Sequence, residues 1–102
     1  MTSPTARSLE HLRKQGYTAE VVERWIPGAN IRKDLYGFID ILAINDTEVL
    51  GVQTTSGEHV AERVAKIAEH DNFAKVCKHI RVLVHGWRKN AQGRWMLREV
   101  QM

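Results

Sequence analysis

Polar residues stand inside and at the end of two apolar runs in the segment "GFIDILAINDTEVLGVQTTSG", residues 37–57. Asp40 lies within the first run, and the second run ends in polar residues that include Gln53 and Thr55. Side chains alternate between the two faces of a β-strand, so Gln53 and Thr55 share a face. The Asn-Asp pair between the runs favours a tight turn. Antiparallel pairing through this turn is expected to bring Asp40 next to Gln53.

A carboxylate within a core strand lowers stability unless it is paired, hydrogen-bonded or bound to a metal ion. Asp40 therefore needs a partner. Asp34, in the loop "RKDLYG", either approaches the same corner as Asp40 or caps a turn. Glu20 and Glu23 are further acids, on the strand predicted to precede that loop.

The elements around this hairpin follow from hydrophobic periodicity and from turn-forming residues. A helix is expected before Gly16, and a helix with an apolar face and Ser56 as its N-cap is expected after the hairpin. The predicted class is α/β, a mixed sheet of about five strands flanked by helices, in the order α-β-β-β-α-β-β. The predicted elements are a loose end 1–4, a helix 5–15, a strand 17–27, the hairpin 37–56, a helix 56–70 with a continuation 71–78, and strands 79–87 and 93–102.

The predicted order and the hairpin resemble the PD-(D/E)XK nuclease superfamily, in particular small archaeal-type and phage Holliday-junction resolvase-like proteins. The resemblance covers nearly the whole chain, from Thr5 to Val100. "GFIDILAI" looks like the strand that bears the family's metal-binding aspartate, which falls on Asp40. "GVQTTSG" looks like the strand that bears the (D/E)-x-K signature. The resemblance implies a restriction-endonuclease-like fold and a Mg²⁺ or Mn²⁺ ion that activates water for phosphodiester cleavage.

The chain departs from this family at two catalytic positions. Gln53 stands at the acidic position of the signature and Thr55 at the lysine position, so Gln53 offers a carbonyl oxygen without a charge. Glu10, in the first predicted helix, looks like the family's additional helix-borne acid. The implied metal ligands are thus Asp40, Gln53 and Glu10. Lys66 or Arg63, on a basic face of the second helix, either supplies the missing positive charge or belongs to a solvated face in which Glu62 pairs with Lys66.

Several other residues are candidates for nucleic-acid binding. Arg32 and Lys33 lead into the hairpin and have the chemistry to bind phosphate. Trp87 precedes Arg88 and Lys89, and basic residues interleaved with aromatics are typical of nucleic-acid-binding segments. The alternative is a solvated loop whose tryptophans pack on the sheet.

Length and charge set limits on the function. The 102 residues correspond to one domain, 1–102, and leave no room for a separate cofactor-binding domain. The formal net charge of +3 is compatible with a nucleic-acid partner. The single cysteine, Cys77, excludes an internal disulfide and is read as a small buried hydrophobe. With no apolar run long enough for a membrane span and no leader pattern, we expect a cytoplasmic protein without membrane or small-molecule cofactor.

Two functions from different classes compete. The first is a metal-dependent endonuclease acting on DNA, with branched or junction DNA as the substrate that the resemblance implies. A homodimer is implied with it, because a junction has paired cleavage sites. The second is a catalytically impaired nuclease fold that serves as a nucleic-acid-binding or assembly module, since both the acid and the lysine of the signature are replaced.

Overall fold

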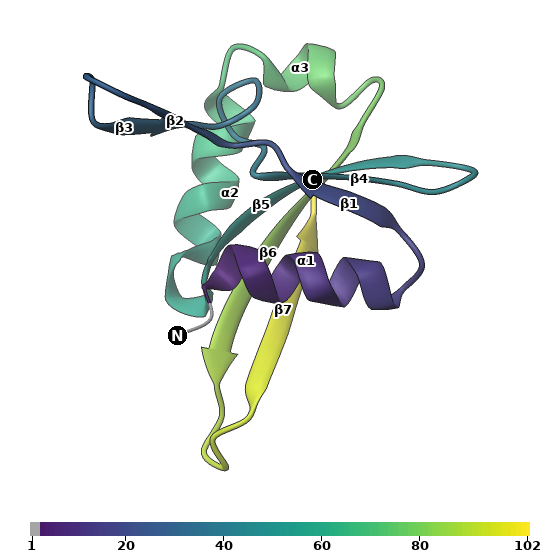
Figure 1. The fold of residues 1–102 in the computed structure, drawn as a ribbon, viewed down its shortest axis with the longest axis vertical. Coiled ribbons are helices and arrows are strands. Elements are labelled where there is room, and N and C mark those ends of the chain that lie inside the picture. Colours follow the sequence, from purple (N-terminus) through teal and green to yellow (C-terminus); the bar gives the residue numbers. More distant parts are fainter. Residues whose placement is uncertain (1–2) are drawn as a thin grey trace.

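The fold is a five-stranded mixed sheet with helices on both faces and a small separate hairpin (Figure 1). The structure is a computed structural model that describes residues 3–102. Its elements are α1 (Pro4–Lys14), β1 (Thr18–Val21), β2 (Arg24–Ile26), β3 (Ile31–Lys33), β4 (Ile41–Ile44), β5 (Val49–Ser56), the 3₁₀ turn η1 (Gly57–His59), α2 (Val60–Glu69), α3 (Phe73–Val76), β6 (Arg81–Lys89) and β7 (Trp95–Gln101).

The main sheet has the strand order β1-β4-β5-β6-β7. β5 and β6 run parallel, and the other neighbouring pairs are antiparallel. A parallel pair needs a crossover connection, which η1, α2 and α3 provide here. The predicted α/β class and the mixed sheet of about five strands are thus confirmed.

Two apolar clusters hold the helices against opposite faces of the sheet. On one face, Leu12 of α1 packs with residues of β1, β4, β5 and β6. On the other face, Val60 and Ile67 of α2 pack with Val82 and Val84 of β6. β5 lies at the centre, and its residues 50–55 are all buried. A strand covered on both faces reads as a continuous apolar run rather than an alternating one, which explains "VLGV".

The predicted order of elements is wrong between residues 17 and 36. The single strand expected over 17–27 is two strands, and the loop expected after it contains β3. β1 pairs with β4 in the main sheet, whereas β2 pairs only with β3. The turn between β2 and β3 contains Gly28 with φ +87° and Asn30 with φ 55°. These left-handed residues reverse the chain locally, so β2 and β3 form a hairpin of their own.

Most other local predictions are confirmed. α1 and Gly16 (φ +96°) match the expected helix and its end, and the tight turn between β4 and β5 follows Ile44. Of the expected loose end 1–4, residues 1–2 lie outside the described residues. The Ser3 hydroxyl accepts from the N–H of Ala6, and Pro4 already belongs to α1. Residues 3–102 contain no helix of the length and apolarity needed to cross a membrane.

Two local predictions are wrong. Ser56 precedes η1, and its side chain makes no capping hydrogen bond, while α2 itself starts only after His59. Cys77 is exposed at the end of α3 rather than buried, because this short helix turns Val76 and not Cys77 toward the core.

Candidate functional site

Asp40 lies where the chain enters β4 and bends. Ile39 belongs to the cluster on the α2 face and Ile41 to the cluster on the α1 face, although residues 39 and 41 of a regular strand would share a face. The backbone of Asp40 is nevertheless paired on both sides. Its N–H donates to the carbonyl of Val52 at 2.9 Å, and its carbonyl accepts from the N–H of Val22 at 2.8 Å. These two backbone hydrogen bonds therefore hold Asp40 between its neighbouring segments, although the chain bends at this residue.

One oxygen of Asp40 accepts three hydrogen bonds from β5. Oδ2 lies 2.8 Å from Nε2 of Gln53, 2.8 Å from the backbone N of Thr54 and 3.2 Å from its Oγ1. β5 continues past the start of β4, so the carboxylate takes the place of a strand partner for the Thr54 N–H. The Thr54 hydroxyl also contacts that of Thr5 at 2.8 Å, which ties α1 to the site. The prediction that Asp40 and Gln53 are neighbours is confirmed.

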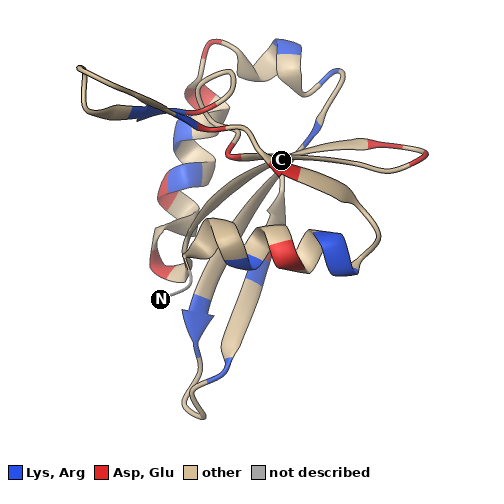
Figure 2. Ribbon diagram, viewed as in Figure 1, with Lys and Arg blue, Asp and Glu red and all other residues tan. Residues whose placement is uncertain are grey.

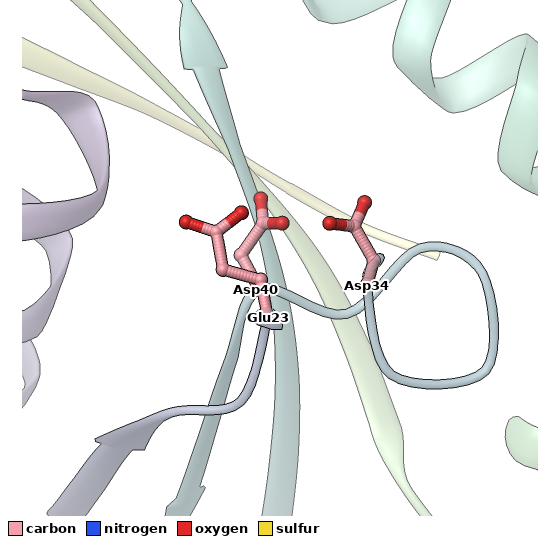
Figure 3. Close-up of side chains that lie close together, drawn as sticks. All are labelled: Glu23, Asp34 and Asp40. Atoms are coloured by element: carbon pink, nitrogen blue, oxygen red, sulfur yellow. The ribbon is translucent and has the colours of Figure 1, made fainter. Parts of the chain in front are cut away.

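Three carboxylates converge at this point (Figure 3). Glu23 follows Val22, whose N–H is bonded to Asp40, and Asp34 comes from the loop after β3. One oxygen of each of Glu23, Asp34 and Asp40 lies within 4.8 Å of the others. Three separate segments of the chain thus place acids at one end of the central strands.

The three acids open onto a polar cavity of about 270 Å³, the acidic cavity. Two arginines share it: Nη1 of Arg32 lies 3.6 Å from Oε1 of Glu23, and Arg63 comes from α2. Nε of Arg63 is buried without a hydrogen-bond partner. The cavity therefore presents carboxylates together with guanidinium groups, which bind phosphate in a bidentate manner. Its lining residues are Pro4, Thr5, Glu23, Arg32, Asp34, Asp40, Gln53, Thr54 and Arg63.

Burial raises the pKa of each of these carboxyl groups. For Asp40, which is 4% exposed, burial and the neighbouring Asp34 raise the pKa from 3.8 to about 6, against the opposing effect of the Thr54 hydrogen bonds. Burial is also the main reason that the pKa of Asp34 is raised, with the charge of Glu23 adding to it. The pKa of Glu23 is raised by burial and by the charge of Asp40. Each of these carboxyl groups therefore keeps its proton to a higher pH than usual, and a bound cation would displace that proton.

The donor set fits a hard divalent cation. Mg²⁺ and Mn²⁺ prefer carboxylate oxygens and water as ligands. The cavity is wide enough for one such ion and its bound waters. Glu23, Asp34 and the second oxygen of Asp40 would hold such an ion. Gln53 donates its amide N–H to Asp40. Its side-chain carbonyl oxygen is the atom that could act as a further ligand.

The other residues expected at the catalytic centre lie elsewhere. Glu10 is exposed on α1 and pairs with Lys14 at 3.0 Å, on the side of the helix opposite the buried Ser8 and Leu12. It is not among the residues that line the acidic cavity. Thr55 is buried in β5, and Thr54 lines the cavity in its place.

Lys66 and Arg63 differ in their surroundings. Nζ of Lys66 lies 3.1 Å from Oε1 of Glu62, which is the ordinary helical pair that the alternative interpretation described. Lys66 lines an adjoining cavity of about 180 Å³ that shares Asp34, Gln53 and Arg63 with the acidic one. Of the two cations, Arg63 is the one that lines the cavity shared by all three acids.

The predicted nucleic-acid-binding residues fall on two hairpins and on α2. Arg32 and Lys33 belong to β3, and Arg88 and Lys89 are exposed in β6. Trp87 is half-buried, and its Nε1–H donates to Oγ of Ser8 at 2.8 Å.

A buried polar chain that the sequence did not reveal connects α1 to β6 and β7. Ser8 Oγ lies 2.9 Å from Nδ1 of His85, and Nε2 of His85 lies 2.9 Å from Glu99. Burial lowers the pKa of His85, with Glu99 opposing this effect. The neutral ring therefore donates from Nε2 to Glu99 and accepts at Nδ1 from Ser8. Both Ser8 and His85 are fully buried, so this chain stabilises the packing of α1 and presents no nucleophile to solvent.

No protein-family model matches the chain, and neither a curated protein nor a solved structure was found to be similar to it.

Proposed function

We propose that the protein is a metal-dependent endonuclease acting on DNA, with branched or junction DNA as its substrate. The observation that carries this proposal is the convergence of Glu23, Asp34 and Asp40, whose oxygens lie within 4.8 Å of one another in a polar cavity. The resemblance of the hairpin 37–57 to that of PD-(D/E)XK nucleases also supports it. The ligand set differs from the one first expected, because Glu23 and Asp34 take the places of Glu10 and Gln53.

The side chains of the cavity have distinct roles in this proposal. Glu23, Asp34 and Asp40 hold the cation, and Gln53 orients Asp40 through the bond from its Nε2. A divalent ion supplies a Lewis acid and lowers the pKa of a bound water. Arg63 and Arg32 bind the phosphate to be cleaved and neutralise its charge. Arginine does not lose its proton near neutral pH, so one of the carboxylates accepts the proton of the attacking water. The water oxygen bonds to phosphorus as the P–O bond to the leaving strand breaks, and the leaving oxygen takes a proton from solvent.

A second candidate is a module of the same fold that binds nucleic acid without cleaving it. The observation that favours it is the absence of lysine from the residues that line the acidic cavity. The motif position holds Thr55, and Lys66 is engaged with Glu62. The homodimer implied by the resemblance stays a prediction for either candidate.

A cleavage assay separates the two candidates. Duplex, single-stranded and four-way-junction DNA are incubated with Mg²⁺, with Mn²⁺ and with a chelator. The nuclease proposal expects cation-dependent cleavage that Asp40→Asn slows at least about 100-fold. Asp71→Asn, which removes an exposed carboxylate outside the cavity, is the matched control and should leave cleavage unchanged.

Other outcomes decide against one or both candidates. Binding of DNA without cleavage under every cation condition supports the module and contradicts the nuclease. Cleavage that survives the chelator or Asp40→Asn contradicts the proposed site. A failure to bind any of the three DNAs at low salt contradicts both candidates.

A further inference from the structure

The positive charge of the protein is concentrated on two hairpins. The β2–β3 arm, residues 24–33, contains Arg24, Arg32 and Lys33 and no acid. The β6–β7 arm, residues 86–98, contains Arg88, Lys89, Arg94 and Arg98 and no acid. These seven are nearly half of the 15 Lys and Arg residues, and the rest of the chain holds eight with all 12 Asp and Glu. The two arms are cationic, and the remainder is acidic.

Most of these cations have no acidic partner. Among residues 3–102, only Arg32 of the seven lies within ion-pair distance of a carboxylate, that of Glu23. Arg24 and Lys33 even stand opposite each other in the β2–β3 register. Like charges directly opposite in an antiparallel pair are destabilising. A bound polyanion would offset the repulsion between Arg24 and Lys33.

The shape of the arms suits a nucleic-acid duplex. Figure 1 shows both hairpins projecting from the body in different directions. In Figure 2 the outer part of the β6–β7 hairpin carries blue segments and no red. A two-stranded ribbon fits the major groove of B-DNA, which is about 12 Å wide. Exposed apolar side chains accompany the cations: Trp25 is 53% exposed, and Met96 is 49% exposed.

Both arms are connected to the elements of the acidic cavity. Arg32 of the β2–β3 arm lines the cavity itself. In the β6–β7 arm, Arg88 lies against Gly57, the residue that follows β5 directly, where a Cβ on Gly57 would come 3.1 Å from that of Arg88. The same arm is held to α1 by Arg7, whose guanidinium lies 3.7 Å from the ring centroid of Trp95. A duplex bound by the arms would therefore lie across the end of the sheet that carries the acids.

We propose that the β2–β3 and β6–β7 arms bind the phosphate backbone of duplex DNA on both sides of the acidic cavity. This inference rests on the proposed function for the identity of the polyanion. It assigns most of the binding energy to the six arm cations other than Arg32, none of which lines the acidic cavity. Binding by the arms then needs neither the metal ion nor the three carboxylates.

The salt dependence of DNA binding tests this directly. Anisotropy titrations of a labelled duplex, in chelator, give the slope of log K against log salt for each variant. Each lost phosphate contact makes this slope shallower by about 1. Arg24→Gln/Lys33→Gln and Lys89→Gln/Arg94→Gln should each make it shallower by about 2. Lys75→Gln/Lys78→Gln, which removes one exposed cation within α3 and one just after it, should leave the slope unchanged.

Charge-preserving variants separate loss of charge from loss of structure. Arg24→Lys/Lys33→Arg and Lys89→Arg/Arg94→Lys should retain the wild-type slope. Arm variants with the slope of the control would overturn the proposal, and so would tighter binding to single strands than to the duplex or no binding at low salt. All of these titrations are done in chelator, so they report binding alone. If the protein binds DNA here but does not cleave it in the assay with Mg²⁺ or Mn²⁺, only the proposed nuclease is contradicted.

Discussion

Replacement of Asp40 by Asn should make the metal-free protein more stable at neutral pH. The buried carboxyl group has a pKa of about 6, whereas the ordinary value is 3.8. At 1.36 kcal/mol per pH unit, this difference corresponds to at most about 3 kcal/mol. Asn has nearly the same shape, and its carbonyl oxygen can accept the hydrogen bonds that Gln53 and Thr54 donate.

The sign of the pH dependence follows from the direction of the shift. Since the pKa of Asp40 is higher in the folded state, the folded protein keeps a proton that the unfolded chain releases between about pH 4 and pH 6. The stability from this proton is complete below about pH 4 and is lost as the pH rises through 6. The stability advantage of Asp40→Asn should therefore be smallest near pH 4 and reach its full size above pH 7.

Urea unfolding in chelator, followed by tryptophan fluorescence from pH 4 to 8, measures this advantage. Asp71→Asn controls for the loss of one negative charge and should run parallel to the wild type. An Asp40→Asn variant that is less stable than the wild type at pH 7.5 would refute the prediction that the buried charge of Asp40 lowers stability. A stability difference that does not change with pH would refute it equally, because it would show that Asp40 does not titrate in this range.

Two further substitutions give independent checks. Gln53→Glu should lower the melting temperature in chelator, because a carboxylate would replace the amide that donates to Asp40. Its rise in melting temperature on adding Mg²⁺ should nevertheless exceed that of the wild type. An equal or smaller rise would count against the ligand set. Ser8→Ala should lower the free energy of unfolding by about 1–3 kcal/mol, because it leaves Nε1 of Trp87 and Nδ1 of His85 without their partner. A loss below about 0.5 kcal/mol in urea unfolding would show that water replaces the hydroxyl.

The centre of the fold could be predicted because its signals are local. The turn residues between the two apolar runs, and the antiparallel pairing that such a turn implies, were enough to place Asp40 beside Gln53. The β2–β3 hairpin could not be predicted in the same way. The residues 17–27 have the composition of one strand, and only the pairing of β1 with β4 decides that the chain leaves the sheet after Val21.

The candidate site was harder to predict because its acids come from distant segments. The N–H of Val22 donates to the carbonyl of Asp40, and this bond brings the next residue, Glu23, close to Asp40. The bond depends on a strand register that no local pattern reveals. Glu10 was misplaced for a simpler reason. Successive helical residues are about 100° apart, so Glu10 points away from the side that buries Ser8 and Leu12.

In the proposed site Glu23, Asp34 and Asp40 together bind one divalent cation, and calorimetric titration with Mn²⁺ measures this binding. One site is expected, whose affinity rises as the pH rises through about 6, the pKa of Asp40, with protons released on binding, because burial raises the pKa values of all three ligands. Binding should be lost in Asp40→Asn and retained in Asp71→Asn. Equal affinity in the wild type and in Asp40→Asn, or no binding by the wild type at pH 8, would show that these three carboxylates do not form a cation site.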